Sequence, residues 1–322
     1  MGDMATLLPT YFGITGISAT KERGSFICKT DWGTFKISKT NESFSAISLR
    51  HDLLTALASA GFPWTDETVP SIEGTPFMQL GRETFIMTRY VKGAEVSLEN
   101  EADVTVALQG LANYHTKGRN LGLTRMPVST PLPEIFAKDA AFLAKTIKQV
   151  ESTTRLSDFD IVFLKNADKY VTDASEAAQL LANTNYHILH NTALHENHIC
   201  HNNIKEENLL IHAQTCYITN WADASIDIQF VDLARFLERY ARRSSKQVPL
   251  DKWLEVYNKI LPLPCTGEEI IRAYLLHPWQ FIKTCKQYYS KKRGWTPIGI
   301  STRMNNLLAE QEEYDAYVRS AL

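Results

Sequence analysis

Alternating apolar and polar positions in the first ninety residues predict β-structure. Residues 24–39 alternate on either side of a turn at residues 31–33, which is the pattern of a hairpin. A second hairpin is predicted over residues 77–90. Between the hairpins, residues 44–60 carry apolar side chains at helical spacing and stop at Gly61. The predicted order is strand, strand, helix, strand, strand.

After this region the periodicity becomes helical. Asn100 precedes an apolar-periodic stretch that ends near Thr116, and Glu101 and Asp103 lie in its first turn. We therefore expect Asn100 to cap a helix. A strand-like insert is predicted at residues 198–221. Further helical stretches are predicted at residues 136–150, 175–190, 233–240, 253–260, 268–289 with a break at Pro278, and beyond Arg303.

Together the two patterns predict an α+β protein. The chain has 322 residues, enough for two domains or for one domain built of two lobes. We expect a small β-rich lobe over residues 1–90 and a large, mainly helical lobe over residues 91–322, with the strand-like insert in the wall of a cleft.

Composition and charge narrow the possible functions. Lys and Arg number 34 against 36 Asp and Glu, a formal net charge of −2, which argues against a dedicated nucleic-acid binder. No apolar run approaches the roughly 20 residues that a membrane helix needs. The five cysteines are scattered without a Cys-x-x-Cys pair, which indicates reduced thiols in a cytoplasmic setting.

The most informative polar residues lie in and after the strand-like insert. An apolar strand ends in the loop that begins at His201 and contains Asn203 and Asn208, and a second short strand ends at Asn220. Asp232-Leu-Ala follows at the start of a helix. Two short paired strands would place the three asparagines at neighbouring loop ends.

These motifs resemble the aminoglycoside-phosphotransferase branch of the protein-kinase-like fold. The family's catalytic loop reads His-x-Asp-x-x-x-x-Asn, and His201 and Asn208 take its first and last places. The family's Asp-Leu-Ala helix start matches at Asp232, and its small-lobe lysine matches Lys36. The resemblance covers nearly the whole chain and implies a two-lobed kinase-like fold.

Within this branch the chain is most similar to the CotS-type bacterial spore coat proteins. The likeness lies in the small-lobe layout, in Leu111-Ala-Asn-Tyr-His-Thr116, and in the basic and aromatic stretch at residues 288–297. It implies a structural or assembly protein of the spore coat, made in the mother-cell cytoplasm. The partners implied are other spore coat proteins, and neither nucleic acid nor a membrane span is expected.

Two departures from the family pattern predict lost chemistry. Asn203 stands at the position of the catalytic base, and Asn220 stands at the position of the metal-binding aspartate. A neutral amide has no comparable basicity, and Mg²⁺ prefers anionic oxygen. We therefore predict a degenerate, pseudokinase-like phosphotransferase that needs no cofactor and holds no metal.

Three alternatives remain open. Asn203 and Asn220 are ordinary loop asparagines if the alignment is off. The chain is an ATP- and Mg²⁺-dependent small-molecule kinase if a nearby acid replaces the lost carboxylates, or a nucleotide-binding regulator if it binds without turnover. The candidate acids are Glu206, Glu207, Asp223 and Asp227.

The remaining candidate residues have structural readings beside the functional ones. Lys36 is either a phosphate-binding lysine or an exposed strand residue, and Asp52 is the nearest acid that would complete its clamp. His201 is expected to fix the catalytic-type loop, and Asp232 to cap its helix. The clustered histidines around His195 have irregular spacing, so we expect no metal site there.

Two basic runs have no place in the kinase-like machinery. Residues 239–243 and 283–293 are rich in Arg and Lys, and the second run is interleaved with aromatic residues. Phosphate contacts and stacking on nucleic acid would use such residues. A solvated helix face with aromatic core contacts is the reading we prefer, and a coat protein has a further use for such a patch in docking on its neighbours.

Overall fold

The computed structural model describes residues 4–22, 24–246, 248–289 and 297–320. The middle of the basic and aromatic stretch singled out above, residues 290–296, lies outside the described residues. The chain divides into two compact units. The first unit is Met1–Pro127 with Glu196–Ile226, and the second is Val128–His195 with Asp227–Leu322. The lobe boundary after residue 90 stays a prediction.

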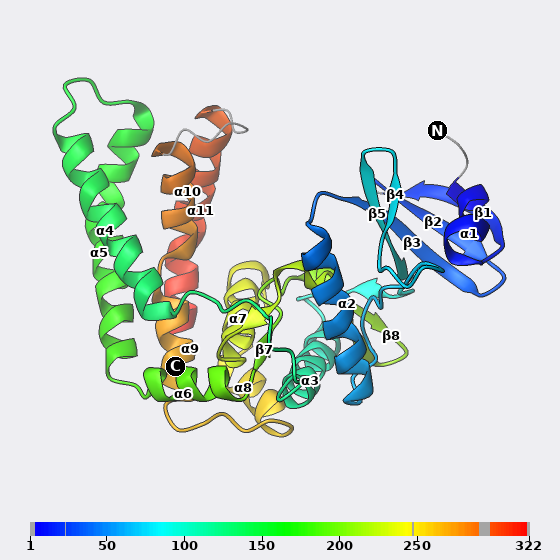
Figure 1. The fold of residues 1–322 in the computed structure, drawn as a ribbon. Coiled ribbons are helices and arrows are strands. Elements are labelled where there is room, and N and C mark those ends of the chain that lie inside the picture. The colour runs from blue at the N-terminus through cyan, green and yellow to red at the C-terminus, as the bar shows by residue number, and fades with distance from the viewer. Residues whose placement is uncertain (1–3, 23, 247, 290–296, 321–322) are drawn as a thin grey trace. The chain divides into compact units, whose positions relative to one another are not determined.

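An antiparallel five-stranded sheet forms the beginning of the first unit, with strand order β1-β2-β3-β5-β4 (Figure 1). Both predicted hairpins are confirmed: β2 pairs with β3, and β4 pairs with β5. Gly33, at a φ of 128°, supplies the left-handed turn conformation between β2 and β3. The strands are β1 (Gly16–Glu22), β2 (Ser25–Thr30), β3 (Gly33–Thr40), β4 (Met78–Leu80) and β5 (Glu83–Arg89).

A helix that the sequence analysis did not predict, α1 (Met4–Phe12), packs on this sheet beside β1. Its Leu8 and Phe12 join Phe35 and Ile37 of β3 in one buried apolar cluster. Phe35 and Ile37 are buried while Lys36 between them is exposed, as the alternation predicted.

The first unit also contains two long helices that begin at side-chain caps. The Ser43 hydroxyl accepts a hydrogen bond from Ala46 N–H at the start of α2 (Phe44–Ser59), and the Asn100 side chain accepts one from Ala102 N–H at the start of α3 (Glu101–Lys117). Both predicted helices and the Asn100 cap are confirmed. On α3, Gly110 lies so close to β9 (Thr215–Ile218) that an added Cβ would lie 2.6 Å from the Cβ of Cys216. Only glycine allows this helix to approach the strand so closely.

Short strands form the predicted insert. β8 (Leu209–His212) pairs with β9 on one side and with β6 (Ala94–Glu95) on the other, and β7 (Ile199–Cys200) pairs with β10 (Ser225–Ile226). Two single turns of 3₁₀-helix, η1 (Glu206–Asn208) and η2 (Trp221–Asp223), flank the β8–β9 hairpin.

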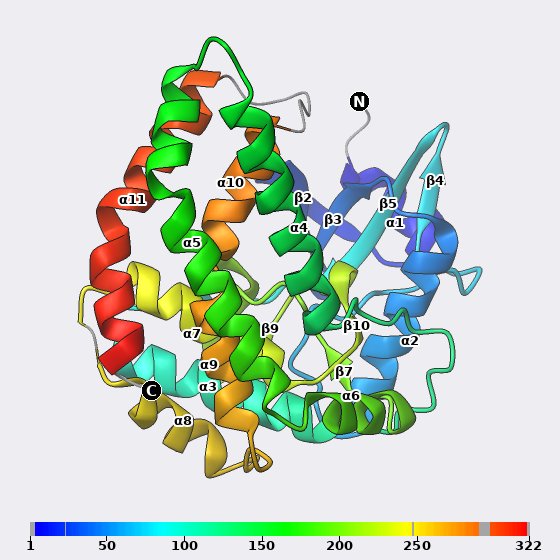
Figure 2. The same cartoon turned by 90° about the vertical axis from the view of Figure 1, so that its left-hand side faces the viewer.

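The second unit, as far as the structure describes it, is built of helices. Figure 2 shows α4, α5, α10 and α11 running side by side. Buried side chains of these helices form one apolar cluster, which includes Phe163, Tyr170 and Phe281. No helix in the described ranges is both long enough and apolar enough to cross a membrane. The helices are α4 (Leu132–Glu151), α5 (Asp158–Ala182), α6 (Tyr186–His195), α7 (Phe230–Arg243), α8 (Leu250–Asn258), α9 (Gly267–Leu276), α10 (Trp279–Tyr289) and α11 (Pro297–Ser320).

The bounds of three of these helices correct the prediction. The stretch predicted at 175–190 is the end of α5 and the start of α6, because α5 already begins at a capping box formed by Ser157 and Asp160. Helix α7 begins at Phe230 with Gln229 at its N-cap, so the prediction that Asp232 is the N-cap is wrong. The predicted break at Pro278 is confirmed between α9 and α10.

Candidate functional site

The β8–β9 hairpin brings the predicted loop residues together within the first unit. The backbone N–H of Thr219, which follows β9, donates to the carbonyl oxygen of Asn208 at 2.9 Å. This bond places Asn220 beside Asn208, on neighbouring ends of the hairpin. The predicted placement of these two residues is thereby explained by strand pairing alone.

Asn203, Asn208 and Asn220 form a hydrogen-bonded group, which we call the amide cluster. The Asn208 side-chain N–H donates to the backbone oxygen of Asn203 at 2.7 Å, and this bond fixes which end of the Asn208 amide is nitrogen. The Asn208 side-chain oxygen then faces Asn220, whose Nδ2 donates to it over a long 3.4 Å. The amides of Asn208 and Asn220 therefore bind each other.

His201 holds this loop through two hydrogen bonds of its ring. Its ring is fully buried, its Nε2 lies 2.9 Å from the carbonyl oxygen of Thr219, and its Nδ1 accepts the backbone N–H of Asn203 at 3.2 Å. A neutral ring that donates from Nε2 satisfies both bonds. The edge of Trp221 packs against the ring at a centroid distance of 4.7 Å. His201 thus links the end of β9 to Asn203.

Asp223 lies beside Asn203. Asn220 takes the left-handed conformation, with φ 67° and ψ 62°, and η2 turns the chain back after it. As a result the Asn203 side-chain N–H donates to the Asp223 carboxylate at 2.8 Å, and Asn202 donates to the Asp223 carbonyl oxygen at 3.2 Å. A carboxylate therefore lies one hydrogen bond beyond the side-chain amide of Asn203.

The other acids considered as replacements for the lost carboxylates have different surroundings from Asp223. Glu207 forms an ion pair with Lys205 at 2.6 Å, and Glu206 is its neighbour on η1. Asp227 belongs to the second unit, where it is buried and accepts the backbone N–H of Ile228; burial raises its pKa. In the described ranges, no group of three His, Cys, Asp or Glu side chains is arranged to hold a metal ion.

Lys36 lines a cavity of about 360 Å³ in the first unit. Thr88, directly opposite Lys36 on β5, lines it too, as do Leu210 of β8 and Thr219. The acidic and basic side chains on its wall are Glu22, Asp66, Glu95 and Glu207 against Lys36 and Arg89. Acidic groups outnumber basic ones, so the cavity on its own repels the phosphates of a nucleotide.

Asp66 is a residue of this site that the sequence analysis missed. The segment before it pairs with β9, since Ile218 N–H donates to the Trp64 carbonyl oxygen at 3.0 Å. One Asp66 carboxylate oxygen then accepts the backbone N–H of Asn220 at 3.1 Å, and the other is buried with no hydrogen-bond partner in the described part of the chain. Burial raises the pKa of Asp66 to about 6, although the charges of Arg50 and Lys36 oppose that rise.

The two other predicted acids have different surroundings. Asp52 is exposed on α2, with its carboxylate 4.0 Å from Arg125. Asp66 lines the cavity together with Lys36, and a role for Asp52 as the lysine's partner stays a prediction. Asp232 is fully buried in the first turn of α7 and pairs with Arg235 at 3.1 Å. It belongs to the second unit.

The raised pKa of Asp66 predicts a pH-dependent effect on stability. Because the folded state binds a proton at Asp66 more readily than the unfolded chain does, stability falls as the pH rises from about 4 to above 6. The change in the free energy of unfolding caused by Asp66→Asn should be more stabilising at pH 8 than at pH 4, by about 1–3 kcal/mol. Urea unfolding at the two pH values measures this difference.

Asp52→Asn is the matched control, because its carboxylate is exposed. Its effect should stay within about 0.5 kcal/mol at both pH values. An Asp66→Asn effect that is the same at pH 4 and pH 8 would contradict the burial of this charge.

Comparison with solved structures shows the fold. An aminoglycoside phosphotransferase from Alicyclobacillus acidocaldarius matches with a TM-score of 0.82 and 15% identity, over 94% of this chain and 91% of that one. A spectinomycin phosphotransferase in an AMP-bound complex matches with a TM-score of 0.70 and 12% identity, over 98% and 96%. The α+β, kinase-like fold predicted from the sequence is confirmed.

Comparison with protein families identifies the branch. No curated protein matches the chain. A family model described as "Spore coat putative kinase YutH" matches residues 6–321, which is nearly the whole chain. The resemblance to spore coat proteins is thereby confirmed. The chain belongs to the spore coat YutH family.

Proposed function

We propose that this chain is a structural or assembly protein of the spore coat that keeps the kinase-like fold but transfers no phosphate. The observation that carries the proposal is the amide cluster, in which Asn208 and Asn220 bind each other. The resemblance to the phosphotransferases aligns Asn203 with the catalytic base. The cavity beside Lys36 then serves as a binding surface, and the amide cluster supports the unit around it.

The chemistry of the amide cluster supports this proposal. In phosphoryl transfer, metal ions neutralise the charge on the transferred group, and a carboxylate orients the attacking hydroxyl. Asn208 and Asn220 offer Mg²⁺ only neutral oxygen, and the Asn208 oxygen already accepts the Asn220 N–H. Loss of general-base help alone slows such a reaction by about 10²–10⁴.

The cavity beside Lys36 supports it in a second way. Its wall carries more acidic than basic side chains. Asp66 lines it together with Lys36, and one Asp66 carboxylate oxygen has no hydrogen-bond partner in the described part of the chain. A phosphotransferase offsets such negative charge with bound metal. Without a strong metal site, only Lys36 and Arg89 of the cavity wall oppose this charge when nucleotide phosphates approach.

Nucleotide binding is the sharpest test of the proposal. We expect millimolar ATP with Mg²⁺ to leave the melting temperature of the wild-type chain unchanged. The double variant Asn203→Asp with Asn220→Asp should gain Mg²⁺-dependent stabilisation, about 2.7 kcal/mol at a hundredfold excess over Kd. Differential scanning fluorimetry measures both.

Two controls define the outcome. Lys36→Met in the double variant should remove the gain if nucleotide occupies the cavity that Lys36 lines. A Mg²⁺-ATP shift in the wild-type chain with phosphate release would refute the proposal. A shift without release would assign the chain as a nucleotide-binding regulator.

A second candidate function, an ATP-dependent small-molecule kinase, is favoured by one observation. The Asp223 carboxylate lies 2.8 Å from the Asn203 side-chain nitrogen, close to where a substrate hydroxyl would be deprotonated. If turnover exists, it should disappear in Asp223→Ala and persist in Asn203→Ala. The reverse result would remove Asp223 as the replacement base.

The family match supports the proposed place of action. We expect synthesis in the mother-cell cytoplasm, followed by assembly into the spore coat with other coat proteins as partners. Nucleic acid is not among the expected partners, because the formal net charge is −2. Expression outside sporulation would contradict this assignment.

A further inference from the structure

A cavity of about 590 Å³ lies among four helices of the second unit, and no step of the proposed function uses it. Its volume lies within the range of small-molecule sites. Helices α4, α7 and α9 each contribute to its wall, but most of the wall is one face of α10. The residues of that face recur at helical spacing and are Trp279, Ile282, Lys283, Lys286 and Gln287.

Four side chains give this cavity an apolar and aromatic wall. The rings of Trp279 and Tyr274 lie 4.7 Å apart between centroids, at an interplanar angle of 33°. Ile135 of α4 and Ile282 add aliphatic surface. The indole N–H of Trp279 already donates to the Tyr274 carbonyl oxygen at 2.8 Å, so it needs no ligand acceptor. A flat aromatic ligand gains most from such a wall, through ring contacts and loss of water.

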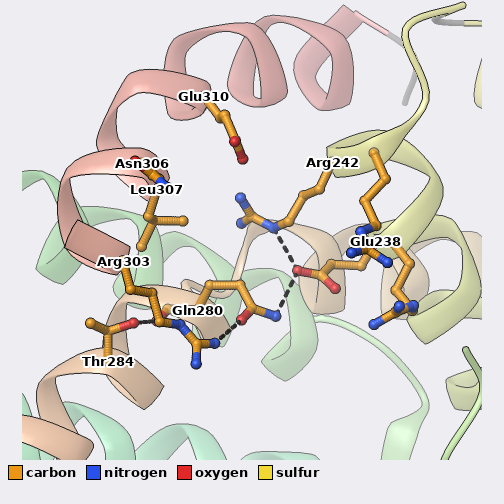
Figure 3. A pocket seen from close by; sticks show the side chains of 10 residues that line it. Glu238, Arg242, Gln280, Thr284, Arg303, Asn306, Leu307 and Glu310 are labelled. Atoms are coloured by element: carbon orange, nitrogen blue, oxygen red, sulfur yellow. Dashed lines mark hydrogen bonds and ion pairs between the residues drawn. The ribbon is translucent and has the colours of Figure 1, made fainter. Parts of the chain in front are cut away.

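Most charges on the wall are balanced within the protein. Lys286 forms an ion pair with the buried Asp139 carboxylate, and Arg242 forms one with Glu238 at 2.6 Å. Gln280 donates to the same Glu238 oxygen at 3.4 Å. Figure 3 shows these Glu238 bonds from an adjoining pocket, which shares Glu238 and Gln280 with the cavity. Neither acid therefore leaves the cavity with a net negative charge.

Lys283 is the charged residue of the wall that remains. It is exposed at the start of the second basic run, and in the described ranges it has no hydrogen bond or ion pair. Gln287 lies one helical turn further along α10, so the two side chains are neighbours. The Gln287 side-chain oxygen accepts a hydrogen bond from Arg303 at 3.4 Å, which leaves the amide N–H groups as donors. Lys283 and Gln287 together offer an anion one positive charge and several N–H donors.

We propose that this cavity binds a small aromatic carboxylic acid in its anionic form. The carboxylate pairs with Lys283 and accepts an N–H of Gln287, while the ring lies against Trp279 and Ile135. One unbalanced cation matches a single negative charge. The inference goes beyond the proposed function and does not depend on it, because the lining residues belong to the second unit and the amide cluster to the first.

Isothermal titration of the full chain with 2-naphthoate, at constant ionic strength, tests this proposal. We expect a Kd on the order of 0.1–1 mM for a ligand of this size. 2-Naphthamide has the same rings without the charge and should bind about fivefold more weakly. Lys283→Gln should weaken naphthoate binding about fivefold and leave naphthamide binding unchanged, and Lys283→Arg should restore the naphthoate affinity.

Two further variants locate the ligand. Lys145→Gln removes an exposed charge from α4 outside the cavity and should leave both affinities unchanged. Ile135→Trp fills the cavity from its half-buried wall and should weaken both ligands at least about tenfold, because the ring space is lost.

Three results overturn the proposal. The first is no saturable binding of naphthoate by the wild-type chain up to about 5 mM, well above the expected Kd. The second is the same naphthoate affinity for Lys283→Gln as for the wild-type chain. The third is a folded Ile135→Trp variant that binds both ligands as tightly as the wild-type chain does, which would place them elsewhere. Because Lys283 is exposed, its variants keep the test decisive if Ile135→Trp does not fold.

Discussion

Replacing Trp221 with alanine should lower the free energy of unfolding by about 3–5 kcal/mol. Trp221 is 1% exposed, and its indole N–H donates to the Ile218 carbonyl oxygen at 2.8 Å. Its ring packs edge-on against Tyr114 of α3 at a centroid distance of 5.0 Å, and against His201. Truncation removes this packing and leaves a large cavity between the helix and the loop that carries Asn203.

Trp32→Ala is the matched control, because Trp32 lies in the β2–β3 turn and is 71% exposed. Its effect should stay within about 0.5 kcal/mol. Urea unfolding followed by far-ultraviolet circular dichroism compares the two variants without depending on tryptophan fluorescence. Equal losses would show that the indole of Trp221 does not support the first unit.

Local signals sufficed for the elements that local chemistry determines. The two hairpins were predicted from alternation and turn residues, and α3 from Asn100 and the acids after it. The break between α9 and α10 follows from Pro278. In each case the residues that form the element also carry its start or stop, so tertiary packing has little to change.

Other elements had weaker signals or signals that were overlooked. α1 is nine residues long with Pro9 inside it, and its stability comes from packing on the sheet rather than from its own propensity. The capping box of Ser157 and Asp160 is present in the sequence and would have found the start of α5. α7 starts two residues before Asp232, and its N-cap residue Gln229 forms no side-chain cap.

The candidate site likewise contains residues that the sequence predicted and residues that it did not. Two short paired strands predicted that the three asparagines lie at neighbouring loop ends, and strand pairing does bring Asn208 and Asn220 together. Asp66 gave no signal, because it reaches Asn220 from 154 positions away only through the pairing of Trp64 with Ile218. The turn of Asp223 toward Asn203 depends on a left-handed asparagine at 220, which spacing alone does not reveal.

Asp139→Ala should lower the free energy of unfolding of the second unit by about 2–4 kcal/mol at neutral pH. Asp139 is 3% exposed on α4, where its carboxylate receives His277 Nε2 at 3.0 Å and forms an ion pair with Lys286. Burial opposes its ionisation, but the hydrogen bonds from His277 and Lys286 outweigh burial and lower its pKa. Removing the carboxylate leaves the buried His277 ring, stacked on Phe136, without its acceptor.

The direction of the pKa shift predicts how this loss depends on pH. The stabilisation from a carboxylate with a lowered pKa is complete above its unfolded pKa of about 4, and disappears as the pH falls through the folded value. The difference between Asp139→Ala and the wild-type chain should therefore shrink in strongly acidic solution. Glu134→Ala, on the exposed face of the same helix, removes only a surface pair with Lys138 and should change stability by less than about 0.5 kcal/mol. If Asp139→Ala lowers the free energy of unfolding at pH 7 by no more than this control, then Asp139 is not coupled to His277 and Lys286. Apolar packing alone would then join α4 to α10.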